Sequence, residues 1–241
     1  MGHGFKFRRQ KLNKCVAIIT ARGGSKRIPR KNIKNFLGFP IIKYSIEAAI
    51  KSKCFDEVMV STDDREIAEV SEKFGAKIPF LRSQATSNDY ATTADVIEEV
   101  ILEYKKTGRN FEYCCCIYPT APFISTEKLK EGFGILKIKK ADSVLPVARF
   151  SYPIQRALKI ENNRLLMFWP EDLNTRSQDL MPAYHDAGQF YWLNVKNFLK
   201  QKKILTENTF SLEIPESEVH DIDCNEDWKI AEMKYSLLKH K

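Results

Sequence analysis

The stretch AIITARGGSKRIPRKN, residues 17–32, carries the strongest structural signal in the chain. Its apolar start predicts a strand over residues 16–20, which runs into a loop with adjacent glycines at Gly23 and Gly24. Because glycine has no Cβ atom, backbone N–H groups there can approach an oxygen closely. Five cations lie in the same loop: Arg22, Lys26, Arg27, Arg30 and Lys31. The loop therefore predicts a site for a phosphate chain, whose charge the cations would neutralise.

This loop matches neither of two common phosphate-binding motifs. The P-loop spacing G-x-x-x-x-G-K-[ST] is absent, because the two glycines are adjacent and Lys26 is followed by Arg27. The dinucleotide-binding pattern G-x-G-x-x-G is absent as well. A strand-to-loop corner with solvated cations is the alternative, but the density of cations beside two glycines favours phosphate binding.

The composition is typical of one large globular domain. The chain has 241 residues, of which 43% are hydrophobic and 29% charged. No apolar run approaches the roughly 18 residues of a membrane span, and no signal peptide is evident, so we expect a cytoplasmic protein with no membrane partner. The six cysteines include no C-x-x-C pair, and three are consecutive in an apolar strand. That pattern favours buried thiols over a zinc site or disulfides.

The net charge of +8 is concentrated in two places. Five cations precede the first strand, and we expect residues 1–13 to form a flexible basic tail. The phosphate loop holds five more, and aromatic residues are not interleaved with basic ones as a single-strand binding face requires. We therefore expect no nucleic-acid partner.

Strands and helices alternate through residues 16–147. Strands are predicted over 57–61, 76–80, 113–118 and 143–147, and helices over 41–51, between Asp64 and Gly75, around 96–104, and over 126–139. This order predicts an α/β fold of Rossmann-like type, with a mostly parallel sheet flanked by helices. The basic loop, the polar segment 82–93 and the corner 119–122 all follow strands, so we expect them to meet at one edge of the sheet.

The second half is less regular. Residues 150–188 contain scattered prolines and short apolar groups, which favour an inserted arm or lid, or a dimer contact, within a single domain over 14–241. Beyond it we predict strands over 189–194 and 209–214, and helices over 195–201 and 225–239.

Several polar residues are candidates for chemistry. Asp221 and Asp223 alternate with Ile222, so an extended backbone would put both carboxylates on one face, where they suit Mg²⁺. A helix-capping acidic turn is an equally good interpretation of their spacing. Asp64, in the pair Asp63-Asp64, is better explained as a helix N-cap. The segment His185-Asp186 could be an acid–base pair, although an ordinary hydrogen-bonded histidine is more common.

Four segments resemble a known family. ARGGSK (21–26), followed by Lys31-Asn32, resembles the signature of the cytidylyltransferases that activate acidic sugars, such as the sialic acid and 3-deoxy-manno-octulosonate enzymes. The segments YPTAPF (118–123), TRSQDL (175–180) and HDAGQFYW (185–192) resemble the pseudaminic acid branch of that family. The resemblance implies nucleotidyl transfer from CTP to an acidic nine-carbon sugar, in a nucleotide-diphospho-sugar transferase fold that forms homodimers.

The resemblance also implies roles for single residues. The triphosphate would lie on Arg22, Gly23, Gly24, Ser25, Lys26 and Lys31, and the cytosine on Asn32 and Arg82, with Ser87 in the same nucleotide loop. Asp221 and Asp223 would hold Mg²⁺, and the catalytic groups would be Arg22, Lys26 and Asp223. The implied sugar-binding residues are Tyr118, Thr120, Arg176, Gln178, His185, Gln189 and Tyr191.

The sugar itself remains open at this point. Tyr118 stands where sialic acid enzymes usually have a glutamine, which favours a differently substituted sugar over sialic acid. Sialic or legionaminic acid is the alternative substrate. A nucleotide-sugar-dependent glycosyltransferase is an alternative of another class, but its D-x-D pair is expected in the first half, whereas this one lies near the C-terminus.

Overall fold

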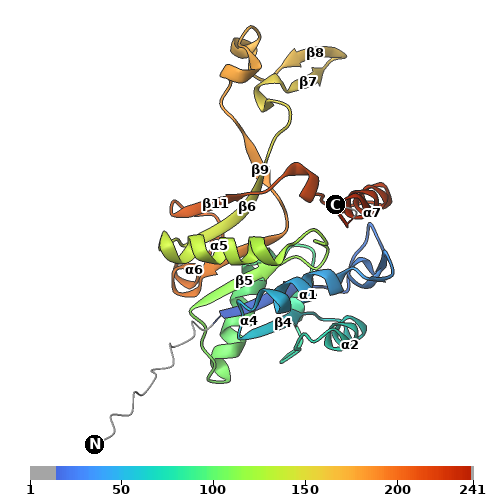
Figure 1. Cartoon of the computed structure of the whole chain (residues 1–241), viewed down its shortest axis with the longest axis vertical. Helices are drawn as coiled ribbons and strands as arrows, with labels where there is room; N and C mark the ends of the chain where they lie inside the picture. Colours follow the sequence, from blue (N-terminus) through green and yellow to red (C-terminus); the bar gives the residue numbers. More distant parts are fainter. Residues whose placement is uncertain (1–14, 240–241) are drawn as a thin grey trace, which may run out of the picture.

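The computed structural model describes residues 15–239, in which a seven-stranded sheet carries helices on both faces (Figure 1). The strand order is β11–β6–β10–β5–β1–β4, and β9 pairs with β6. The strands are β1 (Cys15–Thr20), β4 (Glu57–Ser61), β5 (Tyr113–Ile117), β6 (Ser143–Arg149), β9 (Tyr184–Asp186), β10 (Phe190–Asn194) and β11 (Thr209–Glu213). β1 pairs in parallel with both β4 and β5, whereas β10 is antiparallel to β5 and β6. The predicted α/β class is confirmed.

Helices cover both faces of this sheet. The α-helices of the described residues are α1 (Ile42–Ser52), α2 (Arg65–Lys73), α3 (Gln84–Ser87), α4 (Thr93–Lys106), α5 (Thr126–Ile138), α6 (Val195–Gln201) and α7 (Asn225–Lys239). Successive strand side chains point to opposite faces, so Ala17 and Ile19 join the core under α1 and α5, while Val16 and Ile18 join the core under α4 and α6. This double coverage explains why β1 is apolar at nearly every position.

Strand β5 lies between those two cores. Cys114, Cys115 and Cys116 are fully buried, and burial raises the pKa of each thiol above its usual value. All six cysteines of the chain are free thiols, as their spacing predicts. Within residues 15–239, no helix is both long and apolar enough to cross a membrane.

The strand predicted over residues 76–80 is wrong. Only Lys77 pairs with β4, through an isolated bridge to Met59. Pro79 has no backbone N–H group to continue a ladder, so the chain leaves the sheet there. The polar segment that follows contains the short helix α3. The helix predicted after this segment is α4, which begins at Thr93 because Thr92 and Asp95 form a capping box.

Residues 150–183 project away from the sheet as an arm (Figure 1). The arm leaves through β6 and returns through the antiparallel β9, and the Phe150 N–H donates to the Ala183 carbonyl oxygen at 3.0 Å. A hairpin of β7 (Leu158–Glu161) and β8 (Arg164–Met167) lies within it. Its turn residues Asn162 and Asn163 both have positive φ, the geometry that an Asn-Asn pair favours.

Helix α7 closes the carboxyl side of the sheet. Trp228 packs with Phe36 and with Ile222, which is fully buried. The Asp227 carboxylate accepts the N–H groups of Asp223 and Cys224, at 2.9 and 2.8 Å, and so caps the start of α7. Residues 221–223, just before this helix, belong to no strand. The predicted basic tail, residues 1–13, lies outside the described residues.

Glu57, the first residue of β4, has a buried carboxylate that forms an ion pair. Its carboxylate is about 2% exposed, accepts a hydrogen bond from the Tyr104 hydroxyl, and lies 2.8 Å from Nη1 of Arg109. Burial alone would raise the pKa of Glu57, but the hydrogen bonds from Tyr104 and Arg109 outweigh it and hold the pKa below its usual value.

We expect Glu57→Gln to lower the free energy of unfolding by about 1–3 kcal/mol at neutral pH, because a buried charged acceptor is lost. Since the folded-state pKa of Glu57 is lowered, its stabilisation is complete above the unfolded-state pKa and is lost as pH falls through the folded-state pKa. Urea unfolding of both proteins should show the difference shrinking in acid. Glu103→Gln, which breaks a more exposed pair with Lys106, should cost less than about 1 kcal/mol.

Candidate functional site

Two adjacent cavities lie at the carboxyl ends of β1, β4 and β5, where ligands bind in open α/β sheets. We call the first the basic cavity; its volume is about 200 Å³ and it is lined by Thr20, Arg22, Ser25, Lys26, Arg27, Ile28, Lys31, Asn32, Pro119 and Thr120. We call the second the Tyr118 cavity; its volume is about 210 Å³ and it is lined by Thr20, Arg22, Arg82, Thr86, Asn88, Asp89, Ala91, Thr92, Thr93, Val96 and Tyr118. Thr20 and Arg22 belong to both cavities.

Lys31 joins the basic cavity to the acidic segment before α7. Its Nζ donates to the carbonyl oxygen of Ile222 at 2.7 Å and lies 4.0 Å from the Asp223 carboxylate. Burial lowers the pKa of Lys31, an effect that Asp223 and Asp221 partly offset. Arg27 approaches the same carboxylate, with Nη2 of Arg27 at 2.7 Å from Asp223. The structure thus brings the predicted phosphate cations beside the predicted metal ligands, although they are about 190 residues apart in sequence.

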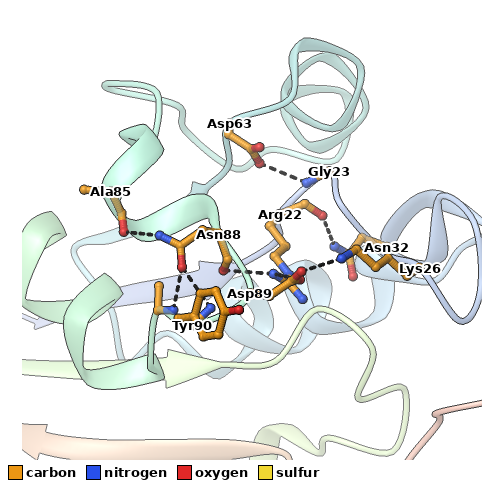
Figure 2. Close-up of polar contacts among 10 residues, drawn as sticks. Arg22, Gly23, Lys26, Asn32, Asp63, Ala85, Asn88, Asp89 and Tyr90 are labelled. Atoms are coloured by element: carbon orange, nitrogen blue, oxygen red, sulfur yellow. Dashed lines mark hydrogen bonds and ion pairs between the residues drawn. The ribbon is translucent and has the colours of Figure 1, made fainter.

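The carboxylate of Asp89 occupies the other end of the predicted cation cluster (Figure 2). It lies 2.8 Å from Nη1 of Arg22 and 2.5 Å from Nζ of Lys26, and Arg22 also donates to the carbonyl oxygen of Asn88 at 2.9 Å. Hydrogen bonds from Lys26 and Arg22 lower the pKa of Asp89. Sequence reasoning missed Asp89, because nothing local to the polar segment 82–93 indicates a contact more than 60 residues away.

The two predicted cytosine readers are both buried. Asn32 donates from Nδ2 to the carbonyl oxygen of Arg22 at 2.8 Å (Figure 2). Arg82 donates from Nε to Oγ of Ser61 at 3.0 Å and from Nη2 to the Ser61 carbonyl oxygen at 2.6 Å. Burial lowers the pKa of Arg82. Each side chain lines a cavity, and their roles toward a base stay predictions.

Three predicted nucleotide-binding residues, Gly23, Gly24 and Ser87, line neither cavity. The Ser87 hydroxyl donates to the carbonyl oxygen of Ser83 at 2.7 Å, within the turn of α3. Thr93, further along the same polar segment, was not among the predicted site residues, but it lines the Tyr118 cavity.

The predicted sugar-binding residues divide into two groups. Tyr118 and Thr120 line the cavities. The Tyr118 hydroxyl lies 3.1 Å from Oγ1 of Thr93, and its ring meets that of Tyr191 edge-on at 5.5 Å. The Tyr191 hydroxyl donates in turn to the Asp186 carboxylate at 2.6 Å. Tyr118, Tyr191 and Asp186 therefore form one contiguous polar wall beside the Tyr118 cavity.

The other predicted sugar-binding residues lie outside both cavities. Gln189 is buried and donates from Nε2 to the Glu218 carbonyl oxygen at 2.6 Å. The His185 ring packs against Phe150, with centroids 4.9 Å apart. Arg176 and Gln178 are exposed on the arm. The structure does not bring these four side chains to Tyr118 within one chain, and their roles toward a sugar stay predictions.

Asp221 and Asp223 are chemically suited to a hard divalent cation. Asp221 is exposed and Asp223 half-exposed, on either side of the buried Ile222. Residues 15–239 contain no cluster of three or more histidine, cysteine or acidic side chains arranged for a metal ion. The protein would thus supply two carboxylates, and phosphate oxygens and water the remaining ligands, which is how proteins usually hold Mg²⁺. Arg27 pairs with Asp223 in this structure, and the role of the two carboxylates toward a metal stays a prediction.

Comparison with known proteins places these features in a family. The family profile described as Cytidylyltransferase matches residues 16–233. The pseudaminic acid cytidylyltransferase of Campylobacter jejuni is 42% identical over 225 residues, which cover 93% of this chain and 97% of the relative. The CMP-N,N'-diacetyllegionaminic acid synthase of Legionella pneumophila is 30% identical over 227 residues, with 93% and 97% covered.

Solved structures of low sequence identity share the fold. The CMP:2-keto-3-deoxy-manno-octonic acid synthetase complexed with CTP superposes with a TM-score of 0.68 at 16% identity, over 95% of this chain and all of that one. Since the family profile spans all the strands and both candidate cavities, and the relatives align along nearly their full length, the chain belongs to the cytidylyltransferase family.

Proposed function

We propose that this cytidylyltransferase transfers CMP from CTP to pseudaminic acid, giving CMP-pseudaminic acid and pyrophosphate. The observation that carries the proposal is that Lys31, which lines the basic cavity together with Arg22 and Lys26, also reaches Asp223. The relatives favour this sugar, because the one at 42% identity carries that activity in its name, and the legionaminic acid enzyme is more distant. Legionaminic or sialic acid is the alternative substrate, and the family assignment leaves a glycosyltransferase without support.

In this reaction the anomeric hydroxyl of the sugar acid attacks the α-phosphorus of CTP. The bond from that phosphorus to its bridging oxygen breaks, and pyrophosphate leaves with the bond's electron pair. The attacking hydroxyl loses its proton to solvent water. The protein's contribution is mainly positioning and charge neutralisation, as in other phosphoryl transfers. Arg22 and Lys26, which line the basic cavity, would bind the negative charge of the triphosphate and of the departing pyrophosphate.

Asp221 and Asp223 would hold Mg²⁺, which supplies positive charge at the phosphate oxygens when bound. Lys31 lies between these carboxylates and the basic loop, and its hydrogen bond to the Ile222 carbonyl oxygen fixes its ammonium group there. Tyr118 and Tyr191 would face the sugar. Burial raises the pKa of both phenols, so they act as neutral hydrogen-bonding groups rather than as bases.

A pyrophosphate-release assay tests this function. Wild-type protein with CTP, Mg²⁺ and each of pseudaminic, legionaminic and sialic acids should release pyrophosphate fastest with pseudaminic acid. Reactions with ATP, GTP and UTP serve as nucleotide controls. Faster release with legionaminic or sialic acid would change the assigned sugar substrate but keep the enzyme class. No release with any sugar acid would refute the proposal.

Asp89 should compete with the triphosphate for Arg22 and Lys26. We expect Asp89→Asn to lower KM for CTP by about two- to tenfold at low ionic strength, because an internal counter-ion is removed from exposed cations. The effect should shrink at high salt. Steady-state kinetics at two salt concentrations measure it, and Asp179→Asn, on the arm, makes the same charge change remote from both cavities. An unchanged or higher KM for Asp89→Asn would contradict the prediction.

We also propose that the arm mediates a homodimer. Its side chains include a group of exposed apolar residues that a soluble monomer would leave in water: Tyr152, Leu158, Ile160, Leu165, Phe168 and Trp169. Light scattering should give twice the mass of one chain. The double change Ile160→Glu and Phe168→Glu should give a monomer, while Leu237→Glu, at an exposed position on α7, should leave the dimer intact. A monomeric wild type would refute this proposal.

A further inference from the structure

The turn Ser61–Asp64, which follows β4 and which we call the β4 turn, contacts three segments of the candidate site. The Ser61 carbonyl oxygen accepts the N–H of Ala21 at 2.9 Å and a guanidinium N–H of Arg82 at 2.6 Å. The Thr62 carbonyl oxygen accepts the backbone N–H of Arg82 at 2.8 Å. The end of β1 and the start of the polar segment 82–93 are therefore both attached to this turn.

Asp63 holds the first glycine of the basic loop. Its Oδ1 accepts the N–H of Gly23 at 2.9 Å (Figure 2). A Cβ atom added at Gly23 would lie 2.8 Å from Oδ2 of Asp64, closer than real Cβ contacts, and 3.0 Å from its Cβ, so the Asp64 side chain would have to shift. The close approach of the β4 turn therefore favours glycine at position 23, and the Gly23 N–H is directed at a carboxylate of the protein.

Asp64 holds the other end of the same loop. Its Oδ1 accepts the N–H of Ile67 at 3.0 Å, which confirms the predicted N-cap of α2. Both of its oxygens also bind the guanidinium of Arg30, which sits in the left-handed region at φ 55°. Pairing with Arg30 is the largest cause that lowers the pKa of Asp64. Arg30, which also pairs with Glu66 in α2, is therefore held by the β4 turn and α2, although the sequence groups it with the phosphate cations.

We propose that Asp63 and Asp64 are positioning residues of the nucleotide site, which fix the two ends of the basic loop so that the cations between them face the triphosphate. The proposal rests on the proposed function. Gly23 and Arg30 are the attachment points, and Lys26 and Arg27 lie between them. A loop held at both ends loses less conformational freedom when a ligand binds, so its cations bind the triphosphate more tightly.

Asp63→Ala and Asp63→Asn test the first attachment. The alanine variant should raise KM for CTP by about tenfold, with KM for the sugar acid and the melting temperature little changed. The asparagine variant keeps an oxygen acceptor for the Gly23 N–H and should restore most of the CTP affinity. An equal rise in both KM values with a lower melting temperature would overturn the proposal, as would failure of asparagine to restore CTP affinity.

Hydrogen exchange supplies a readout that needs no substrate. Asp63→Ala should speed amide exchange in a peptide covering residues 22–31 and leave exchange in α4 unchanged. Unchanged exchange over residues 22–31 would overturn the proposed attachment. If wild-type protein neither binds CTP nor releases pyrophosphate, the proposed function fails, and the exchange data still decide whether Asp63 orders the loop.

Asp64→Asn tests the second attachment, because asparagine still accepts the Ile67 N–H but loses the charge that binds Arg30. We expect higher KM for CTP and faster exchange over residues 22–31. Arg30→Gln should have an effect at least as large, because it also removes the pair between Arg30 and Glu66 in α2. Adding Asp64→Asn to Arg30→Gln should make little further difference, since the contact with Asp64 is already lost. Fully additive effects would overturn the assignment of Asp64 as the partner through which Arg30 holds the loop.

Discussion

Replacing Asp223 with alanine is expected to lower kcat/KM by on the order of 1,000-fold, because a bound divalent ion contributes several kcal/mol of charge stabilisation in such reactions. Asp223 reaches both Arg27 and Lys31, so a divalent ion held by its carboxylate would lie close to the cations of the basic loop. The remaining activity should respond much less to Mg²⁺ concentration. Pyrophosphate release measured over a Mg²⁺ series checks both effects.

The fold should survive this change. Asp223 is half-exposed, and exposed ion pairs contribute only about 0–1 kcal/mol to stability, so the melting temperature should stay close to that of the wild type. Glu226→Ala removes the same charge from an exposed position three residues away and should keep near-normal activity. Near-normal activity of Asp223→Ala would show that the metal binds elsewhere or is not needed.

Lys26→Ala should cost about 2–4 kcal/mol of transition-state stabilisation, the usual loss when a preorganised charge donor is removed. The Lys26 ammonium is mostly exposed and pairs with Asp89, so little of its energy serves the fold. We expect kcat to fall together with kcat/KM, because pyrophosphate gains charge as it leaves. Single-turnover kinetics with saturating CTP separate this effect from weaker ground-state binding.

Two controls make the Lys26 result specific. Lys73→Ala removes an exposed cation from the end of α2 and should leave the kinetics unchanged. Lys26→Arg keeps the positive charge and should retain more activity than the alanine variant. Wild-type kinetics in Lys26→Ala would refute a role for this side chain toward the phosphates.

The regular elements could be predicted because their signals are local. The strand at 57–61 and the helices at 195–201 and 225–239 were predicted with the bounds that the structure has, since apolar periodicity and capping residues mark them directly. The prediction of a strand at 76–80 was wrong because its apolar residues are typical of a strand, but Pro79 has no backbone N–H group to continue the pairing. The β7–β8 hairpin was missed, although its Asn162-Asn163 turn is a local signal.

The site was only partly predictable. The cations of the basic loop could be singled out from residue type and spacing, whereas spacing left Asp221 and Asp223 open between a metal site and a helix-capping turn. Their meeting through Lys31 could not be predicted, because it depends on where α7 packs. The contacts of Asp89 and Asp63 with the loop could not be predicted either, since they join segments about 65 and 40 residues apart, respectively, that only the parallel strand order brings together.

The stem of the arm has a consequence for how such proteins diversify. The arm leaves and returns at neighbouring residues of two paired strands, so residues 150–183 can lengthen, shorten or be exchanged by closing one short turn between β6 and β9. Such changes would leave the pairing register of the strands in the sheet unaltered. Changes in the arm can therefore alter the proposed dimer surface without disturbing the edge of the sheet where the basic cavity lies. The dimer surface and the basic cavity can evolve at different rates.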